Sequence, residues 1–144
     1  MGLAAFAMVL AAAALVVAFT RSPGGTAPVS SPARKYTPAE SATAQQQLCD
    51  VYKVQARTVR SDTAGTDEAL APIAATNGAV MLYNAAANPA LEAKYRDAAR
   101  ALATAYGNLS ALGSKGVATD AEWRTVLDDA NAKDAEMRSL CGGG

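Results

Sequence analysis

The sequence has no histidine and only two cysteines among its 144 residues. Histidine is the commonest metal ligand and the commonest general base near neutral pH. Without it, neither a Ser-His-Asp triad nor a Glu-x-x-His di-iron site can form. The glycine-rich pieces are residues 24–25 and 142–144, which are typical of a linker and a tail rather than of a phosphate-binding loop. We therefore expect no enzyme, no metal and no bound cofactor.

The chain also lacks net charge and has few aromatic residues. It carries 13 basic and 13 acidic residues, and residues 37–144 hold ten basic and thirteen acidic ones, a balance of −3. A domain with a slight excess of acidic residues lacks the excess of basic residues that nucleic-acid binding requires, so no nucleic-acid partner is expected. Beyond residue 20 there are five tyrosines, one tryptophan and no phenylalanine. Abundant alanine with few aromatics predicts an all-α protein of thin, closely packed helices.

The one long hydrophobic run covers residues 3–19 and holds no charged or hydrogen-bonding side chain. As a helix it spans about 26 Å, against a bilayer core of about 30 Å. No basic residue precedes it, and its end is a poor cleavage site. We expect residues 1–20 to be an uncleaved transmembrane signal anchor that contacts the lipid bilayer through residues 3–19. The alternative is a cleaved signal peptide and a secreted domain.

Residues 21–36 are rich in proline, glycine and serine and have almost nothing to bury, so they are predicted to form an extended linker. Four helix signals follow within a predicted bundle domain, residues 37–141, before the Gly tail, residues 142–144. Thr-x-x-Glu capping boxes at Thr37–Glu40 and Thr119–Glu122 open the first and fourth helices. The expected helices cover about 37–61, 66–87, 88–113 and 119–141. Because Pro72 lies in the first turn of the second helix, its start can slip to Leu70 or Ala71.

The connections between these helices are short, which predicts an antiparallel bundle of four helices. The Asn77-Gly78 pair is a turn signal at which the second helix could kink or divide, and a divided helix leaves an irregular bundle of three or four. In the same helix, apolar and asparagine residues recur at alternating steps of three and four: Leu70, Ile73, Asn77, Val80, Asn84 and Ala87.

This spacing places Asn77 and Asn84 on the packing seam of the second helix, where a buried asparagine can fix the register or join a polar network. Tyr95 and Tyr106 are eleven residues apart, on one face of the third helix, and could line a groove for a partner or an apolar ligand. Ordinary core and boundary packing is the alternative for both pairs.

Cys49 lies early in the first helix, and Cys141 ends the fourth. In an up-down-up-down bundle these two positions lie at the same end, so a Cys49–Cys141 disulfide is predicted. The chain-entropy model assigns such a crosslink about 4–5 kcal/mol. Disulfides persist outside the cytoplasm. A disulfide therefore favours a bundle outside the cytoplasm. The basic residues after the apolar run favour a bundle inside the cytoplasm, because positive charge tends to stay on that side: Arg21, Arg34 and Lys35. The cysteines carry more weight, and we expect the bundle on the extracytoplasmic side.

An Ala-rich single span, a Pro/Gly/Ser linker and an Ala-rich helical domain bracketed by Cys49 and Cys141 follow one another along the chain. This layout resembles the small exported or membrane-anchored proteins of mycobacteria and related actinobacteria. The resemblance is compositional and implies a place in the cell envelope. The expected role is that of a non-enzymatic accessory or interaction subunit with a membrane or envelope protein as partner. The alternative is a bundle that carries a small ligand or a lipid.

Overall fold

The computed structural model describes residues 35–67, 69–114 and 118–142. Its helices are α2 (Pro38–Thr63), α3 (Leu70–Ala85), α4 (Ala93–Gly113) and α5 (Asp120–Leu140), and the described part of the chain contains no strand. The expected signal anchor, residues 1–20, and the linker up to residue 34 lie outside the described residues. Within the described ranges, no helix has the length and hydrophobicity that crossing a bilayer requires.

Both capping boxes predicted from the sequence are confirmed. The Glu40 amide donates to Thr37 Oγ1 at 3.2 Å, and the Thr37 amide donates to Glu40 Oε2 at 2.7 Å. Thr119 and Glu122 exchange the same pair of hydrogen bonds at the start of α5. Each box satisfies two backbone donors that have no partner within the helix, which is why these two helices begin where the sequence indicates.

The other two helices begin later than their sequence signals. α3 starts at Leu70 rather than Thr66, so that Pro72 lies in the first turn, where its missing N–H costs nothing. α4 starts at Ala93, because Asn88 is part of a turn instead of a helix cap. The Asn88 side-chain oxygen accepts a hydrogen bond from the Ala90 amide at 3.0 Å. Asn-Pro is as good a turn former as a helix start, and here the turn prevails.

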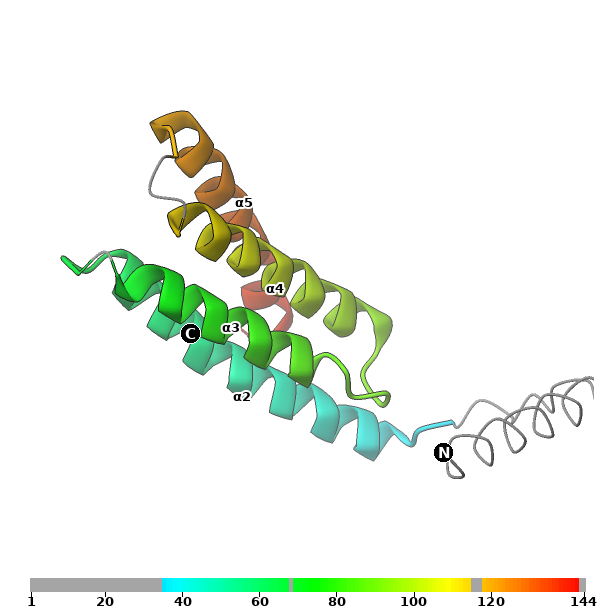
Figure 1. The fold of residues 1–144 in the computed structure, drawn as a ribbon. Coiled ribbons are helices and arrows are strands. Elements are labelled where there is room, and N and C mark those ends of the chain that lie inside the picture. Colours follow the sequence, from blue (N-terminus) through cyan, green and yellow to red (C-terminus); the bar gives the residue numbers. More distant parts are fainter. Residues whose placement is uncertain (1–34, 68, 115–117, 143–144) are drawn as a thin grey trace, which may run out of the picture. The chain divides into compact units, whose positions relative to one another are not determined.

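The four helices form an irregular antiparallel bundle (Figure 1). α3 packs against both α2 and α4, and α4 packs against α5. α2 and α5 meet mainly towards the C-terminal end of α5, where Cys49 and Cys141 are joined. The N-terminal half of α5 diverges from the α2–α3 pair together with the end of α4. The bundle is therefore closed at one end of the α2–α5 contact and splayed at the other.

Alanine dominates the core, as its abundance in the sequence predicts. The largest fully buried side chains are Leu48, Leu82, Leu102 and Met137. Around them lie small residues that let the helix backbones approach closely: Ala44, Ala56, Ala74, Ala75, Ala86, Ala98, Ala99, Ala103, Ala105 and Ala130. Tyr36, expected in the linker, also packs against this core.

Gly78 does not mark a turn; α3 runs through it without interruption. It is buried, and a Cβ atom at this position would lie 3.0 Å from the Tyr106 ring of α4 and 3.2 Å from Val59 of α2. The glycine is thus required for close packing of α3 against both neighbours. The prediction of a kink at Asn77-Gly78 is wrong, because helix packing outweighs the local turn preference.

Two glycine substitutions test this packing. Gly107 lies within α4 with nothing within 4 Å of an added Cβ atom, so Gly107→Ala should raise the free energy of unfolding by about 1 kcal/mol through helix propensity. Gly78→Ala should lose that gain to steric overlap with Tyr106, at a cost of about 1–3 kcal/mol. Urea unfolding followed by circular dichroism measures both. Equal stabilisation by the two substitutions would show that α3 is not closely packed at Gly78.

Candidate functional site

The predicted packing seam of α3 faces outwards, so the expectation that Asn77 and Asn84 lie on a buried seam is wrong. Both asparagines are exposed. Ile73 and Val80, on the same stripe, are 56% and 54% exposed. The buried face of α3 consists instead of its small residues and one leucine: Ala74, Ala75, Gly78 and Leu82. Small side chains allow α3 to lie against α2 and α4 at once, and the larger residues of the stripe do not fit there.

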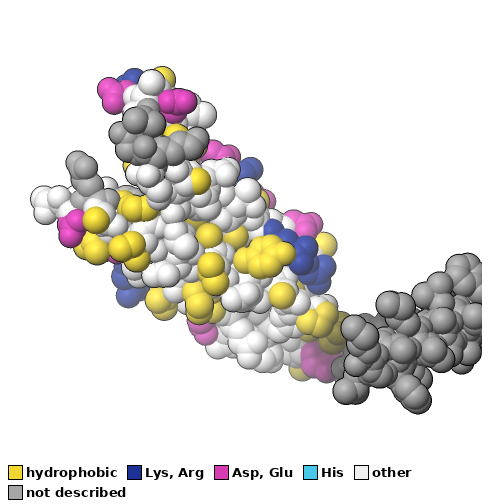
Figure 2. All heavy atoms as spheres, viewed as in Figure 1, with side chains coloured by type: hydrophobic (Ala, Val, Ile, Leu, Met, Phe, Trp, Pro, Cys, Tyr) yellow, Lys and Arg dark blue, Asp and Glu magenta, His cyan; other side chains and the backbone are white. Residues whose placement is uncertain are grey.

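We call Leu70, Ile73, Asn77, Val80 and Asn84 the outer face of α3. Hydrophobic side chains gather along α3 in Figure 2, with charged side chains to either side. All sixteen residues of the helix are uncharged. A surface helix normally has charged residues on its exposed side, whereas the exposed side of α3 presents hydrophobic side chains together with two uncharged asparagines. Next to this face, Met81 and Tyr83 are also exposed.

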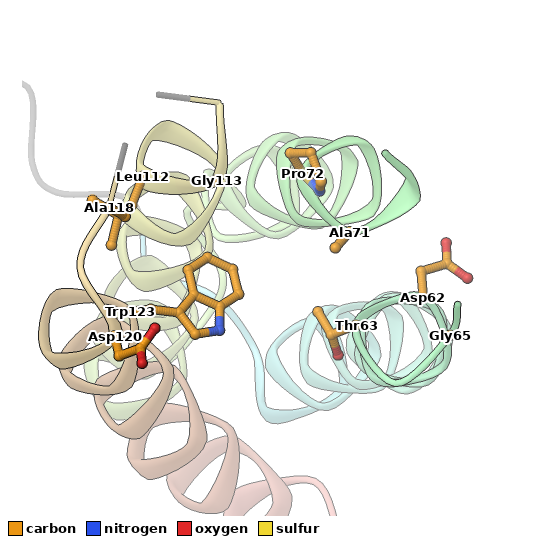
Figure 3. A pocket seen from close by; sticks show the side chains of 10 residues that line it. All are labelled: Asp62, Thr63, Gly65, Ala71, Pro72, Leu112, Gly113, Ala118, Asp120 and Trp123. Carbon is orange, nitrogen blue, oxygen red and sulfur yellow. The ribbon is translucent and has the colours of Figure 1, made fainter. Parts of the chain in front are cut away.

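A cleft of about 460 Å³ opens where the bundle is splayed. Figure 3 shows the indole of Trp123, from α5, projecting between the α2–α3 pair and the α4–α5 pair. Pro72 of α3 and Gly113 of α4 lie on one side of the cleft, and Asp62 and Asp120 place carboxylates at its edges. The cleft therefore combines an apolar wall around Trp123 with polar groups and negative charge at its edges.

Tyr95 and Tyr106 do not form a shared groove. Tyr106 is 4% exposed within the core, where it borders a cavity of only about 50 Å³. Tyr95 packs against the edge of the core, and the Lys94 ammonium lies 5.2 Å from its ring centroid. Tyr106 is thus a core residue and Tyr95 a boundary residue, which is the alternative that the sequence left open.

The predicted disulfide is present: Cys49 of α2 is bonded to Cys141 at the end of α5. The bond joins residues 92 apart in the sequence, with their Cα atoms 5.3 Å apart. It confirms that the first and last helices of the bundle are neighbours, although Cys49 lies near the middle of α2 rather than early in it, so the end of α5 meets α2 midway along its length.

A polar cluster lies beside the disulfide and joins the same two helices. The Tyr52 hydroxyl donates to Asp134 Oδ1 at 2.9 Å, across from α2 to α5. The other carboxylate oxygen of Asp134 is paired with Arg138 one turn along α5 and with Arg60 of α2, whose Nη2 lies 3.6 Å away. Among the described residues, Asp134 is the charged side chain that is buried. Its hydrogen bond and ion pairs offset the free-energy cost of removing its carboxylate from water.

The cluster shifts the ionisation of two tyrosines. Burial, together with the hydrogen bond to Asp134, raises the pKa of Tyr52 to about 12. Burial also raises the pKa of Tyr106 well above its ordinary value, and the nearby Asp134 charge adds to this shift. The hydrogen bond to Asp134 raises the pKa of Arg138, which keeps that guanidinium charged.

Sequence reasoning did not single out this cluster. The available signal was the Asp134/Arg138 pair, four residues apart on a helix, which by itself indicates only a surface ion pair. Its connection to Tyr52 and Arg60 depends on how α5 lies across α2, which the sequence pattern does not specify.

In the described ranges, no three His, Cys, Asp or Glu residues are grouped so as to hold a metal ion. Comparison of the chain with known protein families, with curated proteins and with solved structures finds no match. Three features of this bundle bear on function: the outer face of α3, the Trp123 cleft and the α2–α5 junction.

Alkaline pH should weaken the bundle through its buried tyrosines. The folded state holds the Tyr52 proton up to about pH 12, whereas an exposed tyrosine loses it near pH 10. The contribution of Tyr52 to stability is therefore complete below about pH 10 and is lost as the pH rises to about 12. Tyr106 acts in the same direction. Phenolate absorbance and circular dichroism, recorded together, should show these ionisations accompanying the loss of helix.

Tyr52→Phe is the matched variant. At pH 7 it should lower the free energy of unfolding by about 1.5–3 kcal/mol, because a hydrogen bond to a carboxylate is lost. Above pH 10 its stability should fall less steeply than that of the unaltered protein. If both proteins lose stability with the same slope between pH 10 and 12, Tyr52 does not couple folding to pH.

Proposed function

We propose that this protein is a non-enzymatic interaction subunit, held at the membrane by residues 3–19 with its bundle on the extracytoplasmic side. The apolar run supports the anchor. The Cys49–Cys141 disulfide supports the location, because such bonds persist in oxidising compartments and are rare in the cytosol.

The uncharged outer face of α3 is the observation that carries the interaction role. Its residues recur at steps of three and four, the spacing at which one helix packs along another. The bundle core does not use this stripe, since α3 packs inside through Ala74, Gly78 and Leu82. A heptad pattern with no partner among the described helices supports a helix that packs on it from outside the bundle.

The occupant we propose is the same face of a second copy. The face contains no charge, so two copies meet without like-charge repulsion, and it provides no charged group by which to select an oppositely charged partner. Asn77 lies midway along the stripe, between Ile73 and Val80. A two-fold axis that pairs two antiparallel α3 helices passes close to Asn77, and the two amides can bond across the axis. Anchoring in one membrane raises the effective concentration of the two copies.

Cysteine crosslinking tests the pairing. In the full chain, with Cys49 and Cys141 already bonded, Asn77→Cys should form a disulfide-linked dimer in the membrane upon mild oxidation, because the axis brings the two introduced thiols together. Thr58→Cys, on the exposed side of α2, is the matched control and should remain monomeric. Non-reducing gel electrophoresis measures both.

Adding Ile73→Glu to Asn77→Cys should reduce the crosslink at least tenfold, since a buried unpaired carboxylate opposes the contact. Adding Val54→Glu, at an equally exposed valine of α2, should leave it unchanged. Self-pairing through α3 would be ruled out if the Thr58→Cys and Asn77→Cys variants crosslinked equally. It would also be ruled out if Ile73→Glu left the crosslink of the Asn77→Cys variant undiminished.

The Trp123 cleft supports a second candidate function, the binding of a small amphiphile. Its volume of about 460 Å³ falls within the range of about 300–1,000 Å³ typical of ligand pockets. An indole beside two carboxylates favours an apolar ligand that carries a positive charge, since cations bind to aromatic faces and to acids. The core itself is filled by alanine and leucine, so the cleft is where such a ligand would bind.

Trp123 is the single tryptophan of the chain, so fluorescence excited selectively from tryptophan, and not from the five tyrosines, reports on the cleft. If the cleft binds such ligands, dodecyltrimethylammonium below its micelle concentration should change the emission saturably, and dodecyl sulfate should not. Asp62→Asn with Asp120→Asn should weaken the response about tenfold. A response that does not saturate, or that is equal for both amphiphiles, would exclude a cation-selective cleft.

A further inference from the structure

A second hollow, of about 160 Å³, lies between α2 and α5 beside the disulfide. It is distinct from the Trp123 cleft and from the outer face of α3. Four of its seven lining residues are basic: Lys53, Arg57, Arg60 and Arg138. Tyr52, Ala56 and Gly142 complete the lining. A water molecule occupies about 30 Å³ in the liquid, so the hollow has room for a small polyatomic ion.

The basic residues come from two helices. Lys53, Arg57 and Arg60 follow one another at steps of four and three residues, so they share one face of α2. Arg138 reaches the hollow from α5. The Cys49–Cys141 bond lies one turn before Lys53 on α2 and next to Gly142, and it holds the end of α5 against α2. The disulfide thus ties together the two helices that line the hollow.

Among the described residues, the charge at this hollow is unbalanced. Asp134 pairs with Arg60 and Arg138, which accounts for one negative charge against four positive ones, a balance of +3. Lys53 and Arg57 form no ion pair with any other residue in the described ranges. The Asp134 network and the disulfide join α2 to α5 without Lys53 and Arg57, so the fold does not require these two charges here. Like charges gathered around one hollow repel one another and attract an anion.

We propose that this hollow binds a phosphate group through Lys53, Arg57, Arg60 and Arg138. Arginine presents a planar fork of donors that matches phosphate oxygens, and Lys53 adds a point charge. Asp134 occupies only part of the donor set of Arg138 and Arg60, because each guanidinium has five N–H groups. A doubly charged phosphate monoester compensates a balance of +3 better than a single carboxylate does. The group could belong to a soluble phosphate or to a phospholipid headgroup.

Calorimetric titration of the full, disulfide-bonded chain in a neutral detergent tests the site. The probes are inorganic phosphate, glycerol phosphate and short-chain dihexanoyl phosphatidate below its micelle concentration. Saturable binding of one phosphate per chain is expected, and Lys53→Gln with Arg57→Gln should weaken it at least tenfold. The matched control is Arg100→Gln with Arg124→Gln, which removes the same charge from exposed positions on α4 and α5 and should weaken binding less than twofold.

The probes separate the two sources of phosphate. Phosphatidate that binds at least tenfold more tightly than glycerol phosphate indicates a lipid headgroup, and equal affinities indicate a soluble phosphate. Reduction of the disulfide should weaken binding in either case, because the end of α5 is released. Absence of saturable binding, or equal weakening by both pairs of substitutions, would overturn the proposal. The crosslinking at α3 is independent of this outcome, since Lys53 and Arg57 lie on another helix.

Discussion

The junction between α2 and α5 is the constraint on which the rest of the bundle depends. α3 and α4 are held by neighbours close in sequence, but α2 and α5 are the two ends of the domain. They are joined by the Cys49–Cys141 bond and by the hydrogen bond from Tyr52 to Asp134. Because both connections lie towards one end of the contact, α5 is free to diverge beyond them. The basic hollow next to the disulfide and the open Trp123 cleft farther along are both consequences of this geometry.

The composition of α3 explains why its hydrophobic residues are exposed on an uncharged surface. Gly78 and its alanine neighbours let the helix approach α2 and α4 closely, so the core is filled without the larger residues of the helix. Ile73 and Val80 are then left outside, with Asn77 between them. In a soluble monomer this arrangement carries a solubility cost, because an exposed uncharged stripe tends to associate. Self-pairing through α3 would bury this stripe in a specific interface between two copies.

Local signals in the sequence predicted much of the fold. The two Thr-x-x-Glu boxes mark the starts of α2 and α5, because caps depend on residues only a few positions apart. The seam of α3 was predicted wrongly for a corresponding reason. Its spacing predicts that the stripe lies on one face of the helix, but spacing alone cannot tell whether that face is buried in the bundle or exposed at its surface.

The sequence by itself determined the class of the fold, the helix order, the pairing of its two cysteines and the exclusion of histidine-based chemistry. These follow from composition, from caps and from the topology of four antiparallel helices. Only the tertiary structure decided that Asp134 meets Tyr52 and Arg60, that four basic residues surround one hollow, and that Asn77 faces outwards. The rotation and divergence of each helix depend on side-chain volumes summed over several neighbours, and no short stretch of sequence contains that sum.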